Sequence, residues 1–252
     1  MTDPSVRSSR TAWVAAALTA ASLVTIVVAL VGVQLGLLAP LASFVLFSVG
    51  AVIGGILITV LGLIGVFLTR KGNDRLGARR SWSSFAIGLG LLVFLVFAAE
   101  PWAGYPPIND ITNNIYQPPN FEAVRKVPAN YGRDFNYPPS FAPQVQAAYP
   151  DLKPLELPLP RDEVFALAVQ VAQDMGWTLL RTDPHRWVFE ASDRTAIFRF
   201  VDDISVRVRK GDDGSAVDIR SKSRDGQGDL GANAKRIRAF EARLKAAAAN
   251  AS

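Results

Sequence analysis

The chain has 252 residues, half of them hydrophobic, and carries 27 basic and 22 acidic side chains. The positive excess lies before Glu100, because the residues from there onward hold equal numbers of both signs, which argues against nucleic-acid binding. The chain has no cysteine and one histidine, which argues against disulfides and against Cys- or His-based metal sites, so we expect no cofactor and no metal.

Three long apolar runs come first and cover residues 13–38, 41–69 and 82–102. A helix needs ~20 apolar residues to cross the hydrocarbon of a bilayer, so each run predicts a transmembrane span. The first run is longer than the apolar core of a cleavable signal peptide, and we expect it to be retained. Only Ala39 and Pro40 separate the first two runs, which predicts an antiparallel helical hairpin.

Charge predicts how these spans are oriented. Two arginines lie in the amino end, residues 1–12, and five basic residues lie in the loop at 70–80. Because short loops rich in Lys and Arg stay in the cytoplasm, we expect both segments inside and everything after the third span outside. We expect a bacterial inner (plasma) membrane, with Trp13 and Trp82 at its inner face and Trp102 at its outer face.

Small residues recur four apart in the first two spans, as Gly32 with Gly36 and Gly50 with Gly54. Glycines at this spacing let helix backbones approach closely, either between these three helices or across a homodimer. Glu100, at the very end of the third run, is the one charged residue in the spans. Since ion and proton paths need charged residues inside the membrane, the spans do not indicate a transporter or a channel.

Residues 103–160 hold twelve of the sixteen prolines and eight tyrosine or phenylalanine residues. The prolines exclude long helices and central strands, whereas the aromatic residues are too many for a disordered linker. We expect an ordered, irregular extracytoplasmic segment that lays its aromatic side chains on the folded domain. A flexible tether and a docking surface for a partner are the alternatives.

Residues 161–252 show the pattern of a two-layer α+β domain. One amphipathic helix is predicted between Pro160 and Gly176, and another after Asp229. Between them lie five predicted strands, at 177–181, 187–191, 197–201, 204–210 and 216–223. The connections are too short for parallel crossovers, so the fold class is an antiparallel sheet flanked by two helices.

Motifs spread over this region resemble those of the domain of unknown function 1499 family. They are residues 107–112, 148–150, Arg194, Thr195, Phe198, Phe200, Asp202, Asp203, Arg207, Val208, Val217, Asp218, Arg220, Ser221, Ser223, Arg224, 228–231, Asn233, Ala234 and 236–238. The resemblance covers roughly the carboxy-terminal three-fifths of the chain. It implies a bacterial or plastid-lineage domain that often follows membrane spans, and it implies no catalytic residue.

Ten polar residues of the domain form a candidate ligand site. They are Asp202, Asp203, Arg207, Arg220, Ser221, Ser223, Arg224, Asp229, Asn233 and Arg236. The arginines would bind an anionic or carbonyl group, and the amino end of the last helix would add N–H donors. The competing interpretation is structural. Asp202 and Asp203 then shape a turn, Arg207 pairs with Asp218 across two strands, and Asp229 caps the helix.

We expect an integral inner-membrane protein, without enzymatic activity, whose extracytoplasmic domain binds a ligand or a protein near the membrane surface. Two alternatives stay open: an envelope enzyme using carboxylates and serines around Asp202, Ser221 and Asp229, and a scaffold that acts through its spans. An enzyme would need these residues and Arg207 to converge on a pocket. The expected partners are the lipid bilayer, an envelope protein or lipid-like ligand, and a second copy of the chain.

The single histidine, His185, follows Asp183 and Pro184 in a predicted hairpin turn. A catalytic triad would need this side chain held between a carboxylate and a serine. We expect an exposed turn residue instead.

Overall fold

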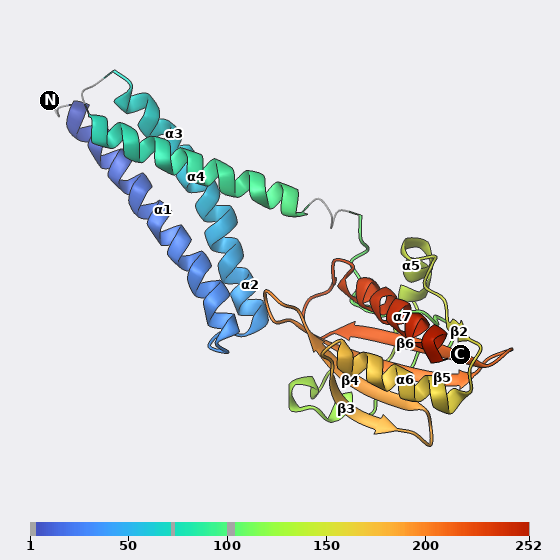
Figure 1. Cartoon of the computed structure of the whole chain (residues 1–252). Coiled ribbons are helices and arrows are strands. Elements are labelled where there is room, and N and C mark those ends of the chain that lie inside the picture. Colours follow the sequence, from blue (N-terminus) through green and yellow to red (C-terminus); the bar gives the residue numbers. More distant parts are fainter. Residues whose placement is uncertain (1–3, 72–73, 100–103, 252) are drawn as a thin grey trace. The chain divides into compact units, whose positions relative to one another are not determined.

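The computed structural model describes residues 4–71, 74–99 and 104–251, and the chain falls into two compact units (Figure 1). One unit holds the helices before residue 104 together with Ile197–Arg199. The other unit holds Gly104–Ala196 and the residues from Phe200 onward.

Long helices make up the first unit. They are α1 (Pro4–Gln34), α2 (Pro40–Ser48), the π-helical η1 (Val49–Gly54), α3 (Gly55–Thr69) and α4 (Arg75–Ala99). Elements α2, η1 and α3 follow one another without a break and form one span. Three stretches of the described chain are long and apolar enough to cross a membrane: Arg10–Gln34, Pro40–Thr69 and Arg75–Ala98. The protein is therefore a membrane protein, as its sequence predicted.

The span boundaries differ from the prediction at two places. The first helix ends at Gln34, four residues early, because Gly36 adopts a φ of +71° and turns the chain. The third begins at Arg75, so the arginines that follow belong to a helix and not to a loop. The predicted end of the third span, with Glu100 and Trp102, lies outside the described residues.

Glycines of the second span lie against neighbouring helices. A Cβ atom at Gly50 would lie 3.1 Å from the carbonyl oxygen of Ser22 in α1, and one at Gly54 would collide with the Ser22 side chain. A Cβ atom at Gly62 would lie 2.8 Å from the Cα atom of Phe85 in α4. These contacts support the packing explanation for Gly50 and Gly54. They do not extend it to the first span, because a Cβ atom at Gly32 would meet only Leu38 and one at Gly36 would meet nothing within 4 Å. The homodimer stays a prediction.

An antiparallel sheet is the base of the second unit (Figure 1). Its strands are β1 (Asp110–Thr112), β2 (Leu155–Leu157), β3 (Thr178–Asp183), β4 (Val188–Arg194), β5 (Val201–Lys210) and β6 (Ser215–Ser223). The strand order is β1-β6-β5-β4-β3, and β2 also pairs with β6. Strands β3 to β6 form the predicted meander, whereas β1 and β2 come from the proline-rich segment.

The strand predicted at 197–201 is not formed, because residues 195–200 are the loop between β4 and β5. The loop is tight: the Thr195 hydroxyl accepts the Phe200 N–H at 2.9 Å, and Arg199 has a φ of +59°. Its apolar composition resembles that of a strand, which explains the wrong prediction. The predicted turn at His185 does join β3 to β4, and His185 is exposed.

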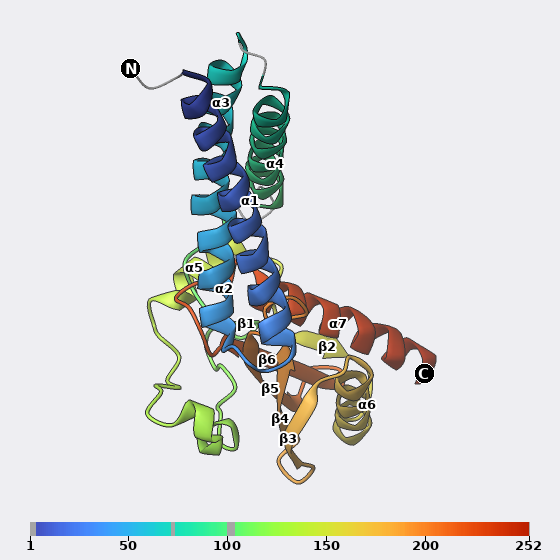
Figure 2. The ribbon, with the colours of Figure 1, turned by 90° about the vertical axis from the view of Figure 1, so that its left-hand side faces the viewer.

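Helices α6 (Arg161–Asp174) and α7 (Ala232–Ala251) cover one face of the sheet, called here the helix face (Figure 2). Their apolar sides meet the alternate apolar residues of β5 and β6, including Ile204, Val206 and Ile219. All three are fully buried, so the main core lies on this face. The predicted two-layer arrangement of helices on an antiparallel sheet is confirmed.

Residues 117–137 of the proline-rich segment cover the opposite face, called here the loop face (Figure 2). By contrast, Val145 and Tyr149 of the same segment pack into the main core. Besides β1 and β2 the segment forms the 3-10 turns η3 (Val124–Lys126) and η4 (Pro128–Asn130) and helix α5 (Phe141–Ala148). Phe121, Val124 and Phe135 make a small second core. The segment is ordered, as its aromatic residues predicted. However, the predicted boundary at residue 160 does not divide the structure, because β1 and β2 belong to the same sheet.

Candidate functional site

Nine of the ten predicted site residues are divided between the two faces of the sheet. On the helix face lie Asp202, Ser221, Ser223, Asn233 and Arg236. On the loop face lie Asp203, Arg207, Arg220 and Arg224. Asp229 lies in the loop before α7. The pocket that an enzyme would need at Asp202, Arg207, Ser221 and Asp229 is therefore not formed, because Arg207 is on the other side of the sheet from Ser221.

Arg236 of α7 is the centre of the helix-face cluster and is only 8% exposed. Its guanidinium contacts Asp202 at 2.6 Å and Asp193 at 2.8 Å, and it also reaches the side-chain oxygens of Ser221 and Asn233. Burial alone would lower the pKa of Arg236, but the two carboxylates raise it above its ordinary value. These side chains satisfy one another, so the cluster fastens α7 to the sheet.

Asp229 is the cap of α7, as predicted. Its carboxylate accepts the backbone N–H groups of Gly231 and Asn233, both at 2.9 Å. Burial raises the pKa of Asp229, and these two hydrogen bonds offset part of that effect. The side chain thus satisfies helix donors that would otherwise lack partners.

A buried ion pair lies at the centre of the loop face. Arg220 of β6 is 1% exposed, and its guanidinium donates two hydrogen bonds, of 2.8 and 2.7 Å, to the Asp110 carboxylate of β1. Lys222 reaches the same carboxylate at 3.0 Å. The guanidinium also lies over the rings of Phe121 and Tyr137, with centroids 4.8 and 5.3 Å away. This ion pair fastens the proline-rich segment to the sheet, and sequence reasoning missed Asp110 as its partner.

The other loop-face residues are also paired within the domain. Arg224 holds Asp203 with two hydrogen bonds, of 2.9 and 2.6 Å, and Asn130 donates a third to the same carboxylate. Arg207 contacts Asp218 at 2.7 Å, and the two residues face each other across β5 and β6. The structural interpretation of Arg207 is confirmed.

Glu190 of β4 is a further buried carboxylate that the sequence did not single out. It is fully buried and accepts the backbone N–H groups of Glu122, Ala123 and Val124 at 2.9 Å. Three N–H groups converging on one carboxylate form an anion-binding nest at the start of η3. In this protein the nest is occupied by the protein's own side chain, which holds the proline-rich segment in place.

A comparison with protein families assigns the chain to a family. A family model described as "Protein of unknown function (DUF1499)" matches residues 113–244, slightly more than half of the chain. The chain belongs to the DUF1499 family. The match runs from just after β1 to the last turns of α7, so the spans and Asp110 lie outside it. None of the curated proteins matches the chain.

A hollow of the DUF1499 domain lies away from the ten predicted residues, between the stretch after β1 and the stretch from α5 to β2. Its volume is about 490 Å³. Its lining residues are Asn113, Asn114, Ile115, Tyr116, Val145, Gln146, Tyr149, Pro150, Leu152, Lys153 and Pro154. All of them come from the proline-rich segment. We call this hollow the groove.

Some polar groups of the groove have hydrogen-bond partners within the domain, and others do not. Asn113 accepts the Ile219 N–H and donates to Val217 and to Glu241, which satisfies it completely. By contrast, the Tyr149 hydroxyl is buried without a hydrogen-bond partner among the described residues. Lys153 is exposed and forms no ion pair with any residue that the structure describes. Within residues 4–71, 74–99 and 104–251, no three His, Asp or Glu side chains gather as metal ligands.

Proposed function

We propose that the DUF1499 domain is a binding module, and that its groove takes an amphipathic, lipid-like molecule with an apolar body and an anionic end. The observation that carries this proposal is an apolar groove with an unpaired cation, Lys153, on its wall. Its volume of about 490 Å³ falls in the range of roughly 300–1,000 Å³ of small-molecule sites. Ile115, Tyr116 and Pro150 would contact the apolar body, and Lys153 would pair with the anionic end.

The paired state of the ten predicted residues supports this choice of site. A ligand on either face of the sheet would have to displace an internal partner, such as Asp110 from Arg220 or Asp202 from Arg236. Removing one partner from a buried pair leaves an uncompensated charge. A ligand in the groove meets no such cost, because Lys153 has no carboxylate to give up.

The chain also supports a membrane source for the ligand. Ten residues separate the end of α4 at Ala99 from the start of β1 at Asp110, so the domain is tethered directly to a span. Molecules with an apolar body and a charged end concentrate at membrane surfaces. The ligand would then be drawn from the lipid phase.

The proposal can be tested by photolabelling the full-length protein in lipid nanodiscs with a diazirine-bearing fatty acid. We expect labelled peptides from residues 145–154, in addition to labelling of the spans by probe dissolved in the bilayer. In Lys153→Glu, the labelling of the groove peptides should fall roughly two- to five-fold. This is the change in affinity expected from the free energy of one exposed ion pair. Lys126→Glu is the matched control, because Lys126 is exposed on η3 and does not line the groove.

Two results would contradict the proposal. Label confined to the spans would show that the groove takes no fatty acid. Equal losses in the Lys153 and Lys126 variants would show that the domain attracts the probe only by its overall charge.

We propose that the DUF1499 domain faces away from the cytoplasm of a bacterial cell, because the basic residues around 70–80 favour the cytoplasmic side. Alkaline phosphatase is active only outside the cytoplasm, so fusions after Ala39 and after Ser252 should be active. A fusion after Lys71 should be silent. Activity after Lys71 together with silence after Ser252 would reverse the orientation.

A further inference from the structure

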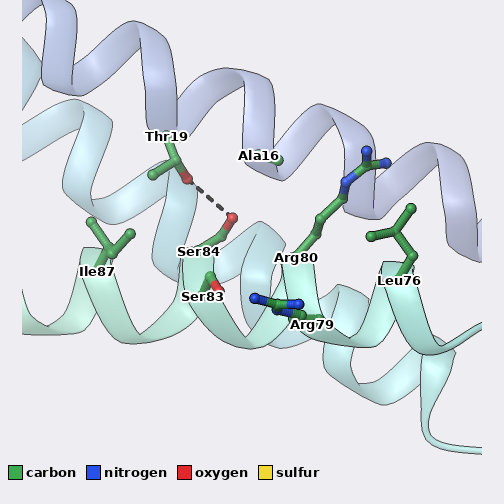
Figure 3. Close-up of a pocket in the computed structure, with 8 residues that line it drawn as sticks. All are labelled: Ala16, Thr19, Leu76, Arg79, Arg80, Ser83, Ser84 and Ile87. Carbon is green, nitrogen blue, oxygen red and sulfur yellow. Dashed lines mark hydrogen bonds between the residues drawn. The ribbon is translucent and has the colours of Figure 1, made fainter.

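A small cleft lies between the amino-terminal half of α4 and the facing turns of α1 (Figure 3). Its volume is about 230 Å³. It is lined by Ala16 and Thr19 of α1 and by Leu76, Arg79, Arg80, Ser83, Ser84 and Ile87 of α4. The α4 residues recur three and four apart, so they share one side of that helix. We call this hollow the arginine cleft.

The two arginines of the cleft, Arg79 and Arg80, have no ion-pair partner among the described residues. Only two acidic residues precede Glu100 in the sequence, and one of them, Asp74, binds the Gly77 N–H with its carboxylate at 2.8 Å. A counter-ion for the arginines is therefore expected from outside the described chain.

Hydroxyl groups line the floor of the cleft between the arginines and the apolar residues. Thr19 and Ser84 are 7% and 2% exposed, and a hydrogen bond of 3.1 Å joins their side chains. Figure 3 shows the Arg80 side chain extending toward α1, while Arg79 leaves α4 near Ser83. Cationic and hydroxyl donors thus surround one small space whose other walls are hydrocarbon.

The cleft lies where a span meets the membrane surface. Trp82, next to the arginines on α4, is 57% exposed, and aromatic side chains of this kind mark the level of the lipid headgroups. Ile87, one turn deeper than Ser83, lies in the apolar part of the same helix. A ligand with an anionic group beside the arginines would therefore have its remaining parts in the acyl-chain region.

We propose that the arginine cleft binds the phosphate group of an anionic phospholipid from the leaflet next to the basic loop. Arginine pairs with phosphate through several parallel N–H donors, and a low-dielectric surrounding strengthens such contacts. Ser83 offers a further hydroxyl for a phosphate oxygen, and the acyl chains lie along α1 and α4 below it. Basic clefts between spans are suited to this class of lipid because the negative charge of the headgroup offsets part of the positive charge of the two arginines. This lipid site is separate from the groove and does not depend on the function proposed for it.

Native mass spectrometry of the full-length protein, reconstituted with equal amounts of phosphatidylglycerol and phosphatidylcholine and released in mild detergent, tests the proposal. We expect the wild type to retain phosphatidylglycerol over phosphatidylcholine by about tenfold or more, as two arginines at a membrane surface allow. The variant Arg79→Gln/Arg80→Gln should retain the two lipids about equally. Arg79→Lys/Arg80→Lys should keep an intermediate preference, because lysine keeps the charge and loses the paired donors.

The matched control is Arg70→Gln/Arg75→Gln, which removes two charges from the same region outside the cleft. It should keep the wild-type preference. Equal losses in both double glutamine variants would overturn the proposal, since the preference would then come from the overall charge of residues 70–80. Displacement of phosphatidylglycerol by inorganic phosphate would overturn the lipid assignment in favour of a site for a free anion.

Discussion

Replacing Asp110 by Asn should destabilise the DUF1499 domain by about 3–5 kcal/mol, the usual cost of removing one partner of a buried ion pair. Arg220 would stay buried and charged, since it is 1% exposed and packed against aromatic rings. Lys222, 3.0 Å from the same carboxylate, would also lose its partner. Hydrogen exchange of β5 and β6 amides in the full-length protein measures this free energy directly.

The chain offers a matched control for this experiment. Arg238 and Asp151 form an ion pair with the same two-point geometry, at 2.6 and 2.7 Å, but their side chains are 41% and 54% exposed. Because water screens exposed pairs, Asp151→Asn should cost less than about 1 kcal/mol. Similar costs for the two variants would show that Asp110 does not hold the sheet together. In the double variant Asp110→Leu/Arg220→Met, much of the lost stability should return.

Glu241 should make the stability of the domain depend on pH. Burial raises the pKa of this carboxyl from 4.5 to about 7, and the hydrogen bond from Asn113 offsets only part of that effect. The folded state therefore binds the proton more tightly than the unfolded state. The stabilisation that protonated Glu241 gives the folded state is complete below pH ~4.5 and is lost as pH rises through about 7.

Glu241→Gln should remove this dependence. The amide has the shape of the neutral acid, so variant and wild type should be similarly stable at pH ~4.5. At pH ~8 the variant should be more stable by as much as about 3 kcal/mol, the free energy that such a pKa difference represents.

Hydrogen exchange across this pH range, corrected for the intrinsic exchange rate, gives the free energy of unfolding against pH for the wild type and for Glu241→Gln. Glu156→Gln, on the exposed side of β2, is the control for the loss of one carboxyl group. A Glu241→Gln curve parallel to that of the wild type would show that the carboxyl is not buried in solution.

Much of the fold could be predicted because local patterns and tertiary structure agree. Apolar and polar residues alternate along β5 and β6 in the sequence, and the sheet has Ile204 and Ile219 on one side and Arg207 and Arg220 on the other. Helix α6 follows a proline and ends at a glycine with a φ of +78°, Gly176, as its sequence indicated. Signals of this kind lie within a few residues of the elements that they specify.

The candidate site was harder to predict because its partners are far apart in the sequence. Arg220 lies 110 residues after Asp110, and Glu190 lies 66 to 68 residues after the N–H groups that it binds. Sequence patterns show that a charged residue lies on the polar side of a strand, but they do not show that a proline-rich segment covers that side. Polar residues that looked available for a ligand are therefore part of the domain's internal structure.

Strand β1 has a practical consequence for work on the isolated domain. A fragment that starts at residue 113, where the family model begins, leaves out all of β1 and with it the negative charge beside Arg220. Such a fragment should express poorly and aggregate through the uncovered edge of β6. Crystallisation or ligand screens should use a fragment that starts no later than Gly104, so that the first strand and the residues leading into it are retained.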